Sequence, residues 1–289
     1  MEINLDKIKE RKPIKELLEF SIINIDKPSG PTSFSVSQFI KNALKLRKTS
    51  HFGTLDPKVS GVLPIALNRA CRLNDYFMHR DKTYAGIMRL HEDIPESKLK
   101  EIIKKYIGKI KQLPPRRSRV KREIREREIK SFEILEINGK DVLFVTTVEA
   151  GTYIRKLCDD IGKEIGGAHM LELRRTKAGI FEESQSINLY DFEKAVEEYN
   201  NGNDKLLKKI LIPAEIISTI LKTFQVKKEA VPKLLRGKPL FREDLEDLDE
   251  ISSLKENEKI ALFYKERFIQ TARITNEKTI IARPEFVLN

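Results

Sequence analysis

The run His51-Phe-Gly-Thr-Leu-Asp-Pro57 holds the side chains best suited to chemistry in this chain. Asp56 lies between Gly53, which disfavours a helix, and Pro57, whose ring biases the preceding residue towards extended geometry. These constraints predict a tight, preformed loop. A carboxylate that is already ordered suits a nucleophile or a base, because it need not be positioned again in each turnover. The simpler interpretation is that a Gly-containing run ending in Asp-Pro is only a turn.

Length and composition place limits on the fold and its partners. With 289 residues, of which 40% are hydrophobic, the chain can bury a core, and we expect one large and one small domain. The formal charge of +11 and the isoelectric point of about 9.4 favour a polyanionic partner.

Membrane, metal and disulfide functions are not expected. No apolar run reaches a membrane-spanning length, and the charged N-terminus does not resemble a signal peptide. Cys71 and Cys158 are the only cysteines and lack metal-ligand spacing, which indicates a reduced, cytoplasmic chain. The four histidines are equally scattered, so we predict no bound metal.

Positive charge is concentrated between Lys98 and Lys130, where 14 Lys and Arg residues face four Glu residues. Within this region, the run from Pro114 to Arg122 is too irregular and basic to be a buried element. We predict an exposed loop that contacts RNA phosphates. The contacting side chains would be those of Arg116, Arg117, Arg119 and Lys121. The alternative is a solvated basic loop without a ligand.

Hydrophobic patterning predicts a mixture of helices and strands. The expected strands are 21–25, 62–66, 82–90, 128–137, 141–148, 259–264, 267–274 and 279–282. Asn138-Gly139 is a strong hairpin signal between two of them. Helices are expected over 34–46, with Thr32 and Ser33 as its caps, and over 152–165. No internal repeat and no glycine loop of the nucleotide-binding type is present.

Five stretches in order resemble the motifs of the pseudouridine synthases of the TruB/dyskerin class. They are Lys27-Pro-Ser-Gly-Pro-Thr-Ser33, His51-Phe-Gly-Thr-Leu-Asp-Pro57 with Gly61-Val-Leu-Pro64, Lys82-Thr-Tyr-Ala-Gly86, Gly151-Thr-Tyr-Ile-Arg-Lys-Leu157, and Leu173-Arg-Arg-Thr-Lys-Ala-Gly179. The resemblance runs from about residue 20 to residue 190. The wording of the motifs is most similar to the archaeal and eukaryotic branch that depends on guide RNA.

The resemblance implies an α+β fold, in which a catalytic domain with an antiparallel-rich mixed sheet precedes a small β-barrel domain of PUA type. The implied division is an N-terminal extension over 1–20 that packs on the C-terminal domain, a catalytic domain over 21–210, and a PUA-like RNA-binding domain over 211–289. The implied partners are tRNA, or guide RNA with an rRNA target, together with box H/ACA companion proteins.

The reaction of this family detaches uracil from ribose, turns it and rejoins it through carbon. It needs no redox change, so no cofactor is expected. By resemblance, Asp56 is the nucleophile, attacking either the sugar or the base. Arg155 pairs with Asp56, which we expect to be partly buried, and keeps it ionised. Tyr84 stacks on the flipped uracil and takes or relays a proton. Taken alone, Arg155 would be a surface arginine and Tyr84 a core tyrosine.

Three further residues are expected to bind the substrate. His51 resembles the family histidine that fills the space left by the flipped nucleotide, and Leu173 packs against the base. Lys27 belongs to the family's first motif and is interpreted as bracing the floor beneath Tyr84. Arg174 and Arg175 are left open, as either phosphate contacts or partners of core carboxylates.

Three functions remain open on these residues. The first is the catalytic subunit of a box H/ACA ribonucleoprotein that acts on rRNA and also on the tRNA T-loop uridine. The second is a stand-alone T-loop tRNA synthase. The third is a non-catalytic RNA-binding scaffold, which the set Asp56, Tyr84 and Arg155 disfavours.

Overall fold

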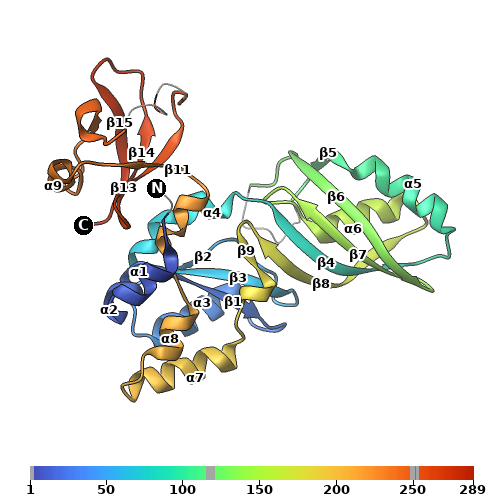
Figure 1. Ribbon diagram of the computed structural model, residues 1–289. Helices are drawn as coiled ribbons and strands as arrows, with labels where there is room; N and C mark the ends of the chain where they lie inside the picture. Colours follow the sequence, from blue (N-terminus) through green and yellow to red (C-terminus); the bar gives the residue numbers. More distant parts are fainter. Residues whose placement is uncertain (1–2, 115–120, 248–250, 252–253) are drawn as a thin grey trace.

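The protein is an α+β structure with two sheets. The computed structural model describes residues 3–114, 121–247, 251 and 254–289. Within these residues a large sheet carries most of the helices, and a smaller C-terminal sheet forms a separate unit near the N-terminus (Figure 1). The predicted fold class, a mixed catalytic sheet followed by a small β-rich domain, is confirmed.

The large sheet has ten strands in the described residues. Eight form a path in the order β10 (Leu211–Pro213), β1 (Ser21–Lys27), β3 (Ser60–Leu67), β8 (Ala168–Ala178), β4 (Lys82–Leu90), β7 (Asp141–Val148), β6 (Arg125–Asn138) and β5 (Gly108–Gln112). In addition, β2 (Thr49–His51) pairs with β3, and β9 (Phe181–Glu182) pairs with β8. Every neighbouring pair is antiparallel except β3 and β8. The sheet is therefore antiparallel-rich and mixed.

The smaller sheet has its own core. Its order is β11 (Lys222–Gln225), β13 (Lys259–Tyr264), β14 (Arg267–Ile274), β15 (Ile280–Val287) and β12 (Leu240–Phe241). Among the described strands of this sheet, only β11 and β13 are parallel neighbours. Strands β13 and β14 have the predicted bounds, whereas β15 continues beyond the predicted end at Ala282.

Helices cover the large sheet in two groups. They are α1 (Leu5–Arg11), α2 (Ile14–Glu19), α3 (Ser33–Ala43), α4 (Asn74–Met78), α5 (Glu96–Tyr106), α6 (Ile154–Lys163), α7 (Leu189–Asn200), α8 (Lys205–Ile210) and, in the C-terminal unit, α9 (Val231–Leu234). Short 3₁₀ turns are η1 (Asn68–Leu73), η2 (Glu183–Gln185), η3 (Ala214–Thr219), η4 (Lys228–Ala230) and η5 (Arg242–Asp244). Helix α6 packs on β8 and against α5, which also contacts β5 and β6, whereas α3 and α7 pack at the β1–β3 end of the sheet (Figure 1).

Local signals account for most of the predicted elements. Strands β6 and β7 turn at Gly139-Lys140, directly after Asn138, and Gly139 has the positive φ that this hairpin needs. The helix expected over 34–46 ends at Ala43, because Lys45 adopts a left-handed backbone with φ 52°. Thr32 is its N-cap, and its side-chain oxygen accepts a hydrogen bond from the Ser35 amide.

The N-terminal helix α1 contacts both parts of the molecule. Ile3 and Ile8 share one apolar cluster with Phe268 of the C-terminal sheet. Arg11 forms an ion pair of 2.7 Å with Glu266. Lys12 pairs with the fully buried Glu215, which follows β10. These contacts join the N-terminal segment to the C-terminal unit.

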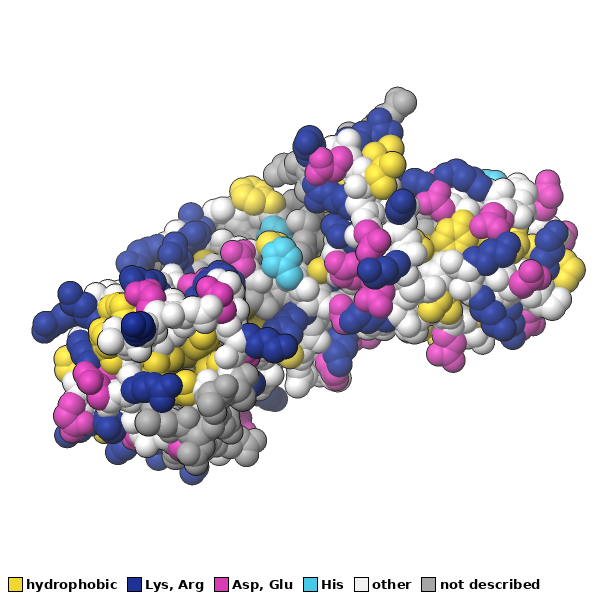
Figure 2. Space-filling model, turned by 90° about the horizontal axis from the view of Figure 1, so that it is seen from above, with side chains coloured by type: hydrophobic (Ala, Val, Ile, Leu, Met, Phe, Trp, Pro, Cys, Tyr) yellow, Lys and Arg dark blue, Asp and Glu magenta, His cyan; other side chains and the backbone are white. Residues whose placement is uncertain are grey.

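The basic region between Lys98 and Lys130 is distributed over several elements. Most of its described cations lie on α5, β5 and β6, Lys121 and Arg122 lie in the segment before β6, and many of the region's cations pair with carboxylates. In Figure 2, Lys and Arg side chains are spread over one whole face with acidic side chains among them. The predicted contacts Arg116, Arg117 and Arg119 lie outside the described residues. Lys121 is exposed and forms an ion pair of 3.1 Å with Glu123.

Candidate active site

Hydrogen bonds hold the Asp56 loop against the segment after β1. The Ser33 hydroxyl donates to the Leu55 carbonyl at 3.0 Å and accepts from the Leu55 amide at 2.8 Å. The Gly30 amide donates to the Pro57 carbonyl at 2.8 Å. The first two family-like motifs are therefore one structural unit, and the loop is preformed as predicted.

Lys27 has a structural position in this unit. Its side chain is fully buried, and the ammonium group donates to the carbonyls of Pro28, Pro31 and Pro57 at 2.7, 2.9 and 3.1 Å. An ammonium has three protons to donate, so none remains for a substrate. We correct the inclusion of Lys27 among the substrate contacts, because it braces the loop from within.

Asp56 and Arg155 form an ion pair, although they are 99 residues apart in the chain. Arg155 lies in the first turn of α6, and that helix is fixed on the sheet by Leu157, Cys158 and Ile161. The Asp56 and Arg155 side chains are 55% and 57% exposed. The expectation that Asp56 is partly buried is wrong, because its side chain is exposed although the preceding Leu55 is buried.

Tyr84 and Leu173 lie on one face of the sheet, on neighbouring strands. Tyr84 of β4 is the register partner of Arg175 in β8, and Gly86 is the partner of Leu173. A side chain on Gly86 would lie 2.8 Å from the Phe144 ring and 2.9 Å from a Leu173 methyl. The glycine therefore leaves space for Leu173, which is 9% exposed.

His51 ends β2, at the entry to the loop. Its Nε2 lies 3.1 Å from the Thr54 hydroxyl oxygen. Burial, and then the positive charge of Arg175, lower the pKa of His51 below its ordinary value. Neutral pH therefore leaves the imidazole uncharged.

The lowered pKa of His51 predicts a loss of stability in acid. The unfolded chain takes up the His51 proton near the ordinary pKa of about 6.5, whereas the folded chain does so only at lower pH. The contribution of His51 is thus complete above that ordinary pKa and is lost as the pH falls below it. Between pH 7.5 and 5, the free energy of unfolding measured in urea should fall less for His51→Gln than for the wild type. Equal losses in the two proteins would contradict this assignment.

Two buried cations near the loop were not assigned a role from the sequence. Lys82 donates to the carbonyls of Met78 and Arg80, and burial lowers its pKa to about 8. Arg175 is buried, whereas Arg174 pairs with Asp26 at 2.8 Å and with Glu183. The alternation of β8 separates the two arginines onto opposite faces. This could have been predicted once the segment was interpreted as a strand.

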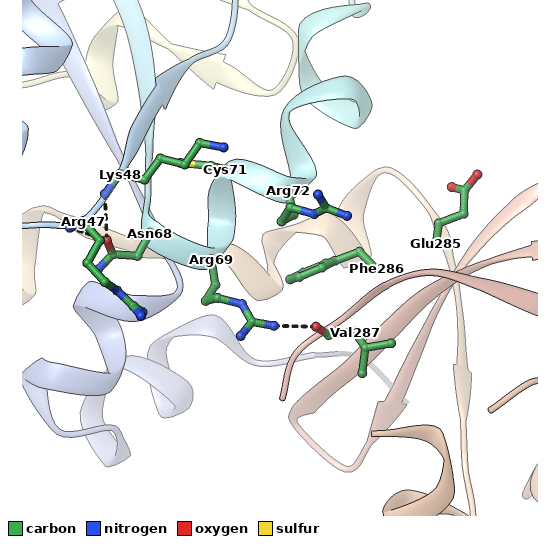
Figure 3. A pocket seen from close by; sticks show the side chains of 9 residues that line it. All are labelled: Arg47, Lys48, Asn68, Arg69, Cys71, Arg72, Glu285, Phe286 and Val287. Atoms are coloured by element: carbon green, nitrogen blue, oxygen red, sulfur yellow. Dashed lines mark hydrogen bonds between the residues drawn. The ribbon is translucent and has the colours of Figure 1, made fainter. Parts of the chain in front are cut away.

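A cavity of about 480 Å³ lies at the junction of the two sheets, away from the Asp56 loop (Figure 3). It is lined by Arg47, Lys48, Arg69 and Arg72, and by residues of β15. Arg69 donates to the Val287 carbonyl at 2.8 Å. None of the predicted site residues that the structure describes lines this cavity.

The described residues contain neither a candidate metal cluster nor a candidate membrane span. No cluster of three or more His, Cys, Asp or Glu side chains among them is arranged to hold a metal ion. No helix in the same part of the chain has the length and apolarity needed to cross a membrane.

Comparisons with known proteins match the chain along most of its length. The family model described as TruB family pseudouridylate synthase, N-terminal domain, matches residues 41–154. The model described as the tRNA pseudouridylate synthase B C-terminal domain matches residues 155–218. A probable tRNA pseudouridine synthase B from Methanothermobacter thermautotrophicus is 39% identical over 241 residues, which span 83% of this chain and 74% of that protein.

Two solved structures resemble the whole fold. A chain in the crystal structure of a Cbf5-Nop10-Gar1 complex has a TM-score of 0.87 and 38% identity, covering 96% of this chain and 88% of its own. A chain in the structure of an H/ACA RNP bound to a substrate RNA containing 2′-deoxyuridine has a TM-score of 0.86 and 35% identity, covering 97% and 89%.

The chain belongs to the TruB family of pseudouridine synthases, which are RNA uridine isomerases. Within that family its fold is the one found in Cbf5, with a C-terminal domain of PUA type.

Proposed function

We propose that this protein isomerises uridine to pseudouridine as the catalytic subunit of a box H/ACA guide ribonucleoprotein acting on rRNA. The observation that carries the proposal is the similarity over 96% and 97% of the chain, including its C-terminal unit, to proteins solved in H/ACA complexes. Its partners would be guide RNA, target RNA and the companion proteins of such complexes. The proposal includes a cytoplasmic location.

The proposed chemistry uses the Asp56 loop. Asp56 is exposed and tied to a preformed loop, so its carboxylate can reach a flipped nucleotide without reordering. Arg155 donates to Asp56 and orients it for attack on the sugar or the base. Tyr84 stacks on the uracil and takes or relays a proton.

The remaining residues would shape the pocket. Neutral His51 can stack in the space vacated by the flipped nucleotide, because its lowered pKa keeps the ring uncharged. Leu173 would present its apolar edge to the base on the sheet face that also carries Tyr84. Lys27 supports the loop and does not touch the substrate.

Two basic regions would contact RNA phosphates. The first is the predicted loop with Arg116, Arg117, Arg119 and Lys121. The second is the cavity at the junction of the sheets, where Lys48 and Arg72 supply positive charge next to the C-terminal unit. We propose the division into an extension over 1–20, a catalytic domain over 21–210 and an RNA-binding domain over 211–289.

A second candidate function is stand-alone modification of the tRNA T-loop uridine. It is favoured by the names of the similar archaeal proteins, which are probable tRNA pseudouridine synthases B. The same Asp56 loop would serve both functions, so the two differ only in how the RNA is presented.

The test separates the two RNA substrates. Purified protein is given a tRNA transcript, or a guide RNA with its rRNA target, each with and without the companion proteins. The main proposal predicts conversion of the rRNA target only when guide and companions are present. Conversion of tRNA alone, with none of the guided target in the complete assembly, would favour the stand-alone function.

A further inference from the structure

Arg175 is the largest fully buried side chain among the described residues, with 1% of its surface exposed. Buried guanidinium groups in proteins are normally paired with carboxylates. Burial lowers the pKa of Arg175, and only Tyr84 acts to raise it, with no contribution from a carboxylate in the described part of the chain. This cation is therefore retained in the core without a neutralising partner.

The Arg175 side chain lies under the Asp56 loop. Its Nε donates to the Val62 carbonyl at 2.8 Å, and its Nη2 donates to the Gly53 carbonyl at 3.0 Å. A methyl group on Gly53 would lie 3.5 Å from Nη1. At Gly61, a side chain would lie 2.2 Å from the Arg175 carbonyl oxygen. Both glycines of the loop motif thus lie directly against Arg175.

Tyr84 is the register partner of Arg175 across β4 and β8. Direct cross-strand partners project from the same face of a sheet. The Tyr84 side chain also acts electrostatically on the guanidinium, because it raises the pKa of Arg175 against the effect of burial. Arg175 is therefore placed between the carbonyl of the Asp56 loop and the aromatic residue of the site.

The charge of Arg175 acts on several groups around the loop. Burial is the largest cause of the lowered pKa of His51, Lys82 and Lys27, and the positive charge of Arg175 is the second cause in each case. A fixed cation that is shielded from water acts strongly on any negative charge that develops nearby.

We propose that Arg175 is a positioning residue for Tyr84, holding the phenol oxygen and the Asp56 loop in one arrangement. This inference rests on the proposed role of Tyr84 in catalysis. Arg175 forms and breaks no bond itself. It fixes the direction of the Tyr84 hydroxyl and stabilises negative charge on that oxygen while the oxygen exchanges a proton.

The first experiment measures orientation without activity. A 3-fluorotyrosine is placed at position 84, and its ¹⁹F resonance is compared in the wild type, Arg175→Lys and Arg175→Met. The resonance should shift or broaden in Arg175→Met and stay closer to the wild type in Arg175→Lys. Arg174→Met is the matched control, because that arginine projects from the opposite face, and it should leave the resonance unchanged. An unchanged resonance in a folded Arg175→Met protein would overturn the inference.

The second experiment measures coupling to the reaction. Single-turnover rates are compared for Arg175→Met, Tyr84→Phe and the double variant, with Arg175→Lys as the variant that keeps the charge and the fold. We expect Arg175→Met to lower the rate about 10²-fold, with partial rescue by lysine and nearly unchanged RNA affinity. In the Tyr84→Phe background, Arg175→Met should lower the single-turnover rate by less than about threefold, because the two residues act together. If Arg175→Met lowers the rate by the same factor in the wild-type and Tyr84→Phe backgrounds, the inference is overturned and the proposed function still stands. Full activity of Tyr84→Phe would instead remove the role of Tyr84.

Discussion

Replacing Asp56 with Asn should lower conversion of uridine by at least about 10⁴-fold while RNA binding persists. The amide keeps the shape of the side chain and can still accept a hydrogen bond from Arg155, but it lacks the charge of a nucleophile. The loop should keep its conformation, because Lys27 and Ser33 hold it through backbone groups. The measurement is pseudouridine formed under single-turnover conditions, with RNA affinity measured in parallel.

A matched control is available on the same sheet. Asp141 also pairs with an arginine, Arg89, and is 34% exposed. Asp141→Asn should retain wild-type conversion, which shows that loss of a paired carboxylate is not harmful in itself. Substantial turnover by Asp56→Asn protein would eliminate Asp56 as the nucleophile.

Replacing Arg155 with Ala should lower the rate by about 10²- to 10³-fold with little effect on folding. The guanidinium orients Asp56, so its loss leaves the carboxylate free to adopt unproductive positions. Both side chains are more than half exposed, and exposed ion pairs contribute about 0–1 kcal/mol to stability. Single-turnover rates and urea unfolding, measured on the same preparation, separate these effects.

Arg89→Ala serves as the control, because it removes an exposed arginine from a carboxylate outside the site. It should have a similarly small effect on unfolding and none on rate. If Arg155→Ala instead loses several kcal/mol of stability, then Arg155 holds the fold and its part in orienting Asp56 is not supported.

Elements with strong local signals could be predicted from the sequence. Strand β4 has the predicted bounds, and the β6–β7 hairpin turns at Gly139-Lys140, within one residue of the predicted Asn138-Gly139. Helix α5 was missed, although Leu99, Ile102 and Ile103 have helical spacing and are buried. Four lysines among its 11 residues make the helix strongly polar and mask the apolar periodicity.

The electrostatics of the site could not be predicted in the same way. The buried cations donate hydrogen bonds to backbone carbonyls, and several of these carbonyls belong to distant segments of the chain. This holds for Lys27, Lys82 and Arg175. No pattern of residue types encodes such partners. The Asp56–Arg155 pair was predicted only through resemblance, because 99 residues separate its members. The exposure of Asp56 depends on how the loop lies on the finished sheet.

The most direct test of the central claim follows the hydrogen on C5 of the target uridine. Rejoining the ring through this carbon sends that hydrogen to water, so RNA carrying tritium at C5 reports each completed isomerisation. With guide RNA and companion proteins, wild-type protein should release tritium in step with pseudouridine, and Asp56→Asn should release none. Absence of release by folded wild-type protein that binds both the guided target and tRNA would contradict the account, as would continued release by Asp56→Asn.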